Sequence, residues 1–276
     1  MTLVENFKKY GFLELENIFS KEQIDLINIK ADPLILKKFN KTKTEILIKE
    51  LIESGIADII LTNENLRKII LTIMPDPILF GFNLYEVNTM QKKTHTNDNS
   101  ADGWHVDTPV LPFLDRKQTN FVSFIIYLTD VMSFEDGPFE VTSENMVEKL
   151  KHKSQSKKIL GCKGTSFIWN NNYLHRASPN IGKIRRRVLK ISFQNNYFQN
   201  SFYPELLNAY PSFLKKDDFT DFVFGKYHLT SIKAHKIDYL LKNYKNSINY
   251  KKIEFNSNVK LSLKLYIRKI LKNILN

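Results

Sequence analysis

The chain has 276 residues, 42% of them apolar, and a single cysteine, Cys162. This length allows one domain with a substantial core, and one cysteine excludes an internal disulfide and any cysteine-rich zinc site. The net charge of +12 is concentrated in residues 231–276, which hold eleven Lys or Arg against two acids, so the body of the protein is not strongly basic.

The apolar runs are too short to cross a bilayer, and the first residues lack the charged-then-apolar pattern of a secretory signal. We therefore expect a cytoplasmic protein.

The first 77 residues are predicted to be mostly helical. A short strand is expected over residues 12–18, followed by a helix whose start is marked by the capping-box spacing of Ser20 and Gln23. Two further helical patterns cover residues 42–56 and 63–74, and the Pro-Asp-Pro at 75–77 ends the second of them.

The centre of the chain is predicted to be β. Short segments rich in β-branched and aromatic residues are separated by turn sequences and lie at residues 78–90, 103–111, 119–131, 139–142, 165–171 and 186–198. No helices alternate with them, which favours an antiparallel sandwich or jelly roll over a βαβ fold.

Helical patterning returns after about residue 200. We expect a jelly-roll domain over residues 1–200 and a basic helical C-terminal extension over 201–276. Its last helix, within 259–276, carries Leu263, Ile267 and Ile274 on one face and lysines elsewhere. Such a helix can dock on the protein's own core, the commoner arrangement, or lie on an anionic membrane surface as a peripheral contact.

One short motif indicates a metal site. His105 and Asp107 are two positions apart, so in an extended segment both side chains point to the same side. Two histidines and one carboxylate typify non-haem Fe(II) oxygenases. His175, between a predicted strand and a turn, is the best third ligand. The other histidines lie in a loop, a polar stretch or the basic tail: His95, His152, His228 and His235.

With these residues in place, the chain resembles the phytanoyl-CoA dioxygenase family of Fe(II)/2-oxoglutarate-dependent oxygenases. That family has a His-x-Asp, a later histidine, an asparagine five residues on and an arginine eleven residues on; here these are His105, Asp107, His175, Asn180 and Arg186. The likeness covers roughly residues 7–196. It implies a cupin-like double-stranded β-helix that uses Fe(II), 2-oxoglutarate and O2, and releases succinate and CO2.

The resemblance implies that Arg186 binds the distal carboxylate of 2-oxoglutarate, a task that suits a planar guanidinium. Hydrophobic patterning would instead bury the face of Arg187, so Arg187 is the reserve. Lys190 shares the Arg186 face and could contact an anionic substrate or end at the barrel rim. Asn83 and Tyr85 share a strand face and either line the pocket or act as ordinary strand residues.

Two further features bear on the site. Trp104 and Trp169 are expected to pack beside the metal-binding strands, and the polar loop from Met90 to Gly103 suits a substrate lid. Asp107 argues for hydroxylation or a related oxidation, because relatives that halogenate have a small residue in its place.

The expected substrate is a small molecule, either anionic or linked to a lipid or glycan. The rival function is a non-catalytic jelly-roll module that binds a ligand and keeps a relict metal site. A nucleic-acid partner is not expected, because the basic tail contains no recognition motif.

Overall fold

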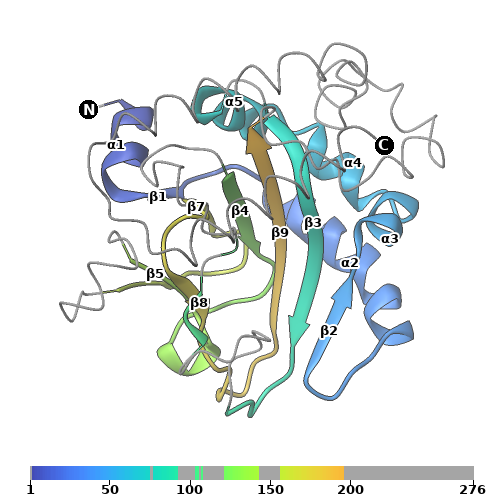
Figure 1. Cartoon of the computed structure of the whole chain (residues 1–276). Helices are drawn as coiled ribbons and strands as arrows, with labels where there is room; N and C mark the ends of the chain where they lie inside the picture. The colour runs from blue at the N-terminus through green and yellow to red at the C-terminus, as the bar shows by residue number, and fades with distance from the viewer. Residues whose placement is uncertain are drawn as a thin grey trace, which may run out of the picture. The chain divides into compact units, whose positions relative to one another are not determined.

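The computed structural model describes residues 2–74, 77–92, 103–105, 107, 121–142 and 156–195 (Figure 1). The predicted C-terminal extension over 201–276, most of the predicted lid loop, and His95, His152, His228 and His235 lie outside these residues. Within the described ranges, none of the helices has both the length and the apolar character that a membrane span requires.

Five α-helices lie in the N-terminal part of the chain: α1 (Leu3–Tyr10), α2 (Lys21–Lys37), α3 (Ile48–Glu53), α4 (Ile56–Leu61) and α5 (Glu64–Ile73). The predicted capping box at the start of α2 is present, with the Gln23 backbone N–H donating to Ser20 Oγ at 3.2 Å. The predicted first strand is shorter than expected and forms β1 (Phe12–Leu15).

The helical prediction for residues 42–56 was wrong at its start. Lys43–Ile46 form strand β2, which pairs antiparallel with β3 (Pro77–Val87). Thr44 and Ile46 alternate with exposed or half-buried neighbours and are themselves buried, a strand period inside an apparently helical pattern. Tertiary pairing along β3 therefore overrides the local helical preference.

Two antiparallel sheets form the body of the protein. The larger has the order β1-β7-β4-β9-β3-β2, with β4 (Phe121–Tyr127), β7 (Ser166–Asn170) and β9 (Arg186–Asn195) at its centre. The smaller has the order β6-β5-β8, with β6 (Lys157–Ile159), β5 (Phe139–Val141) and β8 (His175–Ala177). The sequence had not indicated β6 or β8 as strands.

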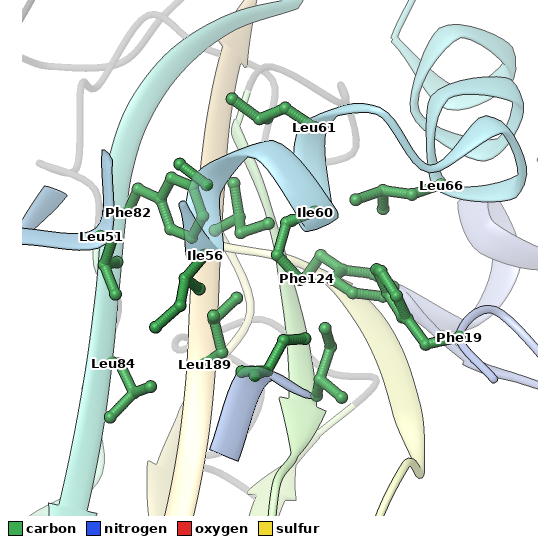
Figure 2. Close-up of a cluster of buried hydrophobic side chains, with 14 of the residues drawn as sticks. Phe19, Leu51, Ile56, Ile60, Leu61, Leu66, Phe82, Leu84, Phe124 and Leu189 are labelled. Atoms are coloured by element: carbon green, nitrogen blue, oxygen red, sulfur yellow. The ribbon is translucent and has the colours of Figure 1, made fainter. Parts of the chain in front are cut away.

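The helices α2, α3 and α4 lie along the larger sheet on the side away from β5 and β8 (Figure 1). Apolar side chains of the helices and of the sheet form one core there, as Figure 2 shows for Ile56 and Ile60 of α4 beside Phe82, Phe124 and Leu189 of the strands. Complete burial of each such side chain stabilises the fold by about 1.5–3 kcal/mol.

A second core fills the space between the two sheets. It contains Phe139 and Ile159 of the smaller sheet and Phe167 and Trp169 of the larger one. Tyr127 links the sheets by hydrogen bonds, because its hydroxyl donates to the Ile159 carbonyl at 2.9 Å and accepts from the Phe139 N–H at 3.0 Å. Two antiparallel sheets enclosing this interior confirm the predicted jelly roll with flanking helices.

Candidate metal centre

The smaller sheet brings His105 and His175 together. His175 is the first residue of β8, and His105 forms an isolated antiparallel bridge with it, with both backbone N–H···O distances at 3.0 Å. The expected strand around His105 is thus a single bridged position among the described residues, and Asp107 lies in a bend. The imidazoles meet because the bridge places their backbones opposite each other.

Asp107 lies between the two rings. Its Oδ1 is 3.3 Å from His105 Nε2, and its Oδ2 is 3.5 Å from His175 Nε2. One ligand atom from each residue lies within 4.8 Å of the others, a spacing that a single metal ion can bridge. The three residues predicted from the sequence therefore share one point in space.

Backbone carbonyls orient both imidazoles. His105 Nδ1 lies 2.9 Å from the Gly103 carbonyl, and His175 Nδ1 lies 3.0 Å from the Tyr173 carbonyl. A carbonyl only accepts, so each Nδ1 donates a proton in these contacts, which leaves each Nε2 as the ring atom that can bind a metal. Both Nε2 atoms face the carboxylate of Asp107, the third group that could bind the same ion.

The charges in this cluster favour an ionised carboxylate. Burial alone would raise the pKa of Asp107, but the Lys190 ammonium and the two imidazoles hold it well below its usual range. Burial lowers the pKa of His175, which keeps that ring neutral. The pKa of His105 is raised, because its contact with Asp107 outweighs the effect of burial.

Aromatic rings pack around His175. The Phe139 ring stacks on it with centroids 5.5 Å apart, and the Trp169 ring is 5.2 Å away. Trp169 Nε1 is buried without a hydrogen-bond partner in the structure. Trp104 packs instead against the Arg176 guanidinium, whose Cζ lies 4.8 Å from its ring centre. A largely apolar wall therefore lies on one side of the metal ligands.

Two polar residues contact the carboxylate of Asp107 from the larger sheet. The Lys190 ammonium forms an ion pair with Oδ2 and lies 5.3 Å from the centre of the Trp169 ring. Asn171 Nδ2 lies 3.5 Å from the same oxygen, and Asn171 Oδ1 is buried with no hydrogen-bond partner in the structure. The sequence analysis missed Asn171, although its position two residues after Trp169 continues the inward-facing register of β7.

Arg186 is buried in the interior between the sheets, at 5% exposure. Its Nη1 donates to the Gly137 and Ser178 carbonyls, the second at 3.1 Å. Among the described residues no carboxylate pairs with this guanidinium, and Nε and Nη2 have no hydrogen-bond acceptor. Burial lowers the pKa of Arg186 to about 10. The group is a buried cation that the described part of the protein leaves without an anion.

Arg187 occupies the opposite face of β9 and has a different environment. Its guanidinium pairs with Glu86 at 2.6 Å and with Asp32 at 2.8 Å, and it donates to Asn28 Oδ1 at 2.9 Å. Both faces of the strand are covered, since Leu189 and Ile191 on this side belong to the core beneath the helices. The charge of Arg187 is thus neutralised inside the helical layer, away from the metal ligands.

The side chain of Asn180 contacts backbone carbonyls of neighbouring segments. Its Nδ2 lies within 3.3 Å of the backbone carbonyls of Val87, Asn88 and Ile184, and the residue is fully buried. It ties the loop between β8 and β9 to the end of β3.

Asn83 and Tyr85 share the inward face of β3, as the sequence predicts. Asn83 Nδ2 lies 2.8 Å from the Tyr85 hydroxyl and 2.7 Å from Glu45 Oε1, while Lys43 Nζ lies 4.2 Å from the centre of the Tyr85 ring. Burial raises the pKa of Tyr85, with further contributions from the nearby carboxylates of Glu45 and Asp107. This cluster therefore borders the interior that holds Asp107.

The donor set fits a divalent transition metal. Two neutral imidazoles and one carboxylate leave coordination positions open, and this is the arrangement of non-haem Fe(II) sites. Each Nδ1 contacts a backbone carbonyl, and Asp107 contacts Lys190. Contacts of this kind orient metal ligands in proteins.

Comparisons with known proteins give the fold. No protein-family model matches the chain, and no curated protein matches it either. Solved structures do match. The non-heme α-ketoglutarate-dependent epimerase SnoN from nogalamycin biosynthesis superposes with a TM-score of 0.56 at 11% identity, covering 71% of this chain and 82% of its own.

Two further solved structures are similar. EctD from S. alaskensis, crystallised with 2-oxoglutarate and 5-hydroxyectoine, has a TM-score of 0.55 at 15% identity and covers 70% of this chain and 74% of its own. The non-heme monooxygenase ThoJ, in a nickel complex, has a TM-score of 0.55 at 12% identity and covers 71% and 78%. At these identities the likeness shows the jelly-roll fold that the three enzymes share with this chain.

Proposed function

We propose that this chain is an Fe(II)- and 2-oxoglutarate-dependent dioxygenase that hydroxylates or otherwise oxidises a small molecule with release of succinate and CO2. The observation that carries the proposal is the convergence of His105, Asp107 and His175, with both Nε2 atoms facing the carboxylate, in the same interior as a buried arginine that has no carboxylate partner among the described residues. The fold shared with SnoN, EctD and ThoJ supports it. Within this fold, the motif spacing leads us to propose membership of the phytanoyl-CoA dioxygenase family.

His105, Asp107 and His175 would hold the metal, and bound Fe(II) would supply the activation of O2. Arg186 would bind the distal carboxylate of 2-oxoglutarate through Nε and Nη2, because Nη1 is already held by the two carbonyls. The guanidinium is thus fixed in orientation before the cosubstrate arrives, which reduces the entropic cost of binding. Arg187 is not proposed for this role, since Glu86 and Asp32 already neutralise it.

The remaining residues around the triad would position the substrate and exclude water. Trp169 and Phe139 form an apolar wall against His175, and a dry site strengthens the electrostatic contacts inside it. Asn83 and Tyr85 border the same interior and would contact the cosubstrate or the substrate.

Succinate formation tests the proposal. Purified full-length protein is supplied with Fe(II), 2-oxoglutarate and O2, and succinate is quantified by mass spectrometry with and without a panel of small molecules, each product being examined for a gain of one oxygen. We expect slow succinate release without substrate, which increases when a panel member is oxidised. His175→Ala, which removes one proposed ligand, serves as the control and should abolish both.

A non-catalytic ligand-binding module would give the opposite result. Protein that binds Fe(II) and 2-oxoglutarate but releases no more succinate than His175→Ala would establish that alternative.

A further inference from the structure

Lys190 is the second inward-facing cation of β9. Its partners among the described residues are the carboxylate of Asp107 and the face of Trp169. Asp107 is also a proposed metal ligand, so a bound dication would share its negative charge and would repel the nearby ammonium. Once the metal is bound, the pair between Lys190 and Asp107 would therefore weaken, and an anion beside Lys190 would be favoured.

The distal carboxylate of 2-oxoglutarate does not meet this need. Arg186 and Lys190 lie on the same face of β9, four residues apart, which is roughly 13 Å along a strand. Arg186 is the deeper cation and has no carboxylate partner in the described part of the chain, so we assign the distal carboxylate to it.

A charge count of the interior gives the same answer. Counting the described residues alone, Fe(II) would bring two positive charges, Arg186, Lys190 and Lys43 one each, and Asp107 and Glu45 one negative charge each. Doubly negative 2-oxoglutarate then leaves one positive charge in excess. Arg176 does not alter the count, because it pairs with Glu140 at 2.8 Å.

Lys43 lies on the same side of the interior as Lys190, so the excess positive charge is on that side. Its ammonium sits over the Tyr85 ring, and Asn83, on the same face of β3, is the direct strand neighbour of Lys190. Lys190 and Arg186 both contribute to the lowered pKa of Lys43, after the larger effect of burial, so the three cations share one region. Glu45, 3.9 Å from Lys43, is the nearby acid on this side.

Resting on the function proposed above, we propose that Lys190, flanked by Lys43, binds an anionic group of the primary substrate, so that this protein oxidises a small molecule bearing a carboxylate, sulfate or phosphate. The anion would take the place beside Lys190 that Asp107 alone fills when no metal is bound. Recognition and metal binding are thereby coupled, because metal binding frees the ammonium for the substrate.

Calorimetric titration of sulfate tests this without turnover. The full-length protein is loaded with redox-inert Ni(II) and saturated with 2-oxoglutarate, whose own binding is measured first. We expect one sulfate to bind, and Lys190→Met to weaken it about tenfold to a hundredfold, the range for a hydrogen bond to a charged group. Lys190→Arg should stay within a few-fold of the parent. Lys49→Met, which removes an exposed charge on α3, should have no effect.

A metal-free pair of variants makes the test independent of the cosubstrate. Asp107→Ala removes the partner of Lys190, so metal-free Asp107→Ala should bind sulfate more tightly than Asp107→Ala/Lys190→Met by the same factor. The parent protein, whose ammonium is paired, should bind it weakly without metal.

The proposal is overturned if sulfate does not bind the loaded protein, if Lys190→Met leaves its affinity unchanged, or if that variant weakens 2-oxoglutarate instead. The last result would make Lys190 part of the cosubstrate site. If 2-oxoglutarate fails to bind the Ni(II)-loaded parent protein, the proposed function fails, and the metal-free pair still reports whether Lys190 binds an anion.

Discussion

Replacing Arg186 by Met should weaken the binding of 2-oxoglutarate strongly while changing the stability of the protein little. Burial lowers the pKa of Arg186 from 12.5 to about 10, which corresponds to a cost of about 3 kcal/mol for keeping the charge in the ligand-free protein. Arg186→Met removes this cost but leaves the Gly137 and Ser178 carbonyls without a donor, at about 1–3 kcal/mol each. The two effects oppose each other, so the free energy of unfolding should change by no more than about 3 kcal/mol.

Binding of 2-oxoglutarate should respond very differently. Two charge-assisted hydrogen bonds to its distal carboxylate contribute about 1.5–3 kcal/mol each, so the Kd of the Ni(II)-loaded protein for 2-oxoglutarate should rise at least about a hundredfold. Urea unfolding and calorimetric titration measure the two quantities on the same preparation.

Arg187→Met is the matched control, because it removes the same group from the other face of the strand. It leaves the buried carboxylate of Glu86 with Arg185 as its only remaining ion-pair partner among the described residues. Breaking a buried pair costs about 3–5 kcal/mol, so this variant should unfold more easily but keep the parent Kd where it is folded. The reasoning is refuted if Arg186→Met destabilises strongly without changing the Kd, or if Arg187→Met is the variant that loses 2-oxoglutarate.

Three further changes test other parts of the structure. Gly137→Ala places a Cβ 2.8 Å from Arg186 Nη1 at a backbone φ of 70°. The variant should lose about 1–3 kcal/mol of unfolding free energy in urea and should also have a higher Kd for 2-oxoglutarate. An unchanged Kd would show that Gly137 does not hold the guanidinium in place. The pKa of His105 is raised, so protons compete with the metal for this imidazole as the pH falls through that pKa. The affinity for Ni(II) should drop about tenfold per pH unit below the pKa of His105 and level off above it. A metal affinity that stays constant from pH 8 to pH 5 would contradict this. Ile60→Ala, in the core beneath the helices, should cost about 2–5 kcal/mol in urea unfolding and leave the Kd for 2-oxoglutarate unchanged in the folded protein.

The sequence predicted the fold class because its strands carry strong local signals. Segments such as those of β4 and β7 combine β-branched and aromatic residues with flanking turn sequences, and both are completely buried. Strand β2 was mistaken for helix because four residues are too few to show a period against the helical pattern that follows. Strands β6 and β8, each of three residues, exist through pairing with β5 rather than through propensity.

The clustering of His105, Asp107 and His175 was predictable from the sequence, and the environment of the cluster was less so. His105 and Asp107 were found by their spacing, although one bridged residue and a bend hold them where a strand was expected. Asn171 shares the face of Trp169 in the predicted strand 165–171, but an asparagine at the end of a strand most often belongs to a turn, so its residue type did not indicate a site. Its proximity to Asp107 depends on the register between β4 and β7, which the local sequence does not contain.

The three consecutive arginines at the start of β9, Arg185 just before it and Arg186 and Arg187 within it, show what kind of information only the structure supplies. Arg186 and Arg187 are both buried, so neither hydrophobicity nor exposure distinguishes them. They differ in what surrounds the charge, since α2 and β3 bring carboxylates to Arg187, whereas the hydrogen-bond partners of Arg186 among the described residues are two backbone carbonyls. A buried cation is costly unless an anion accompanies it, and the described part of the chain provides two carboxylates for Arg187 and none for Arg186. This difference supports the proposed role of Arg186, because the distal carboxylate of 2-oxoglutarate would offset the cost of burying its charge.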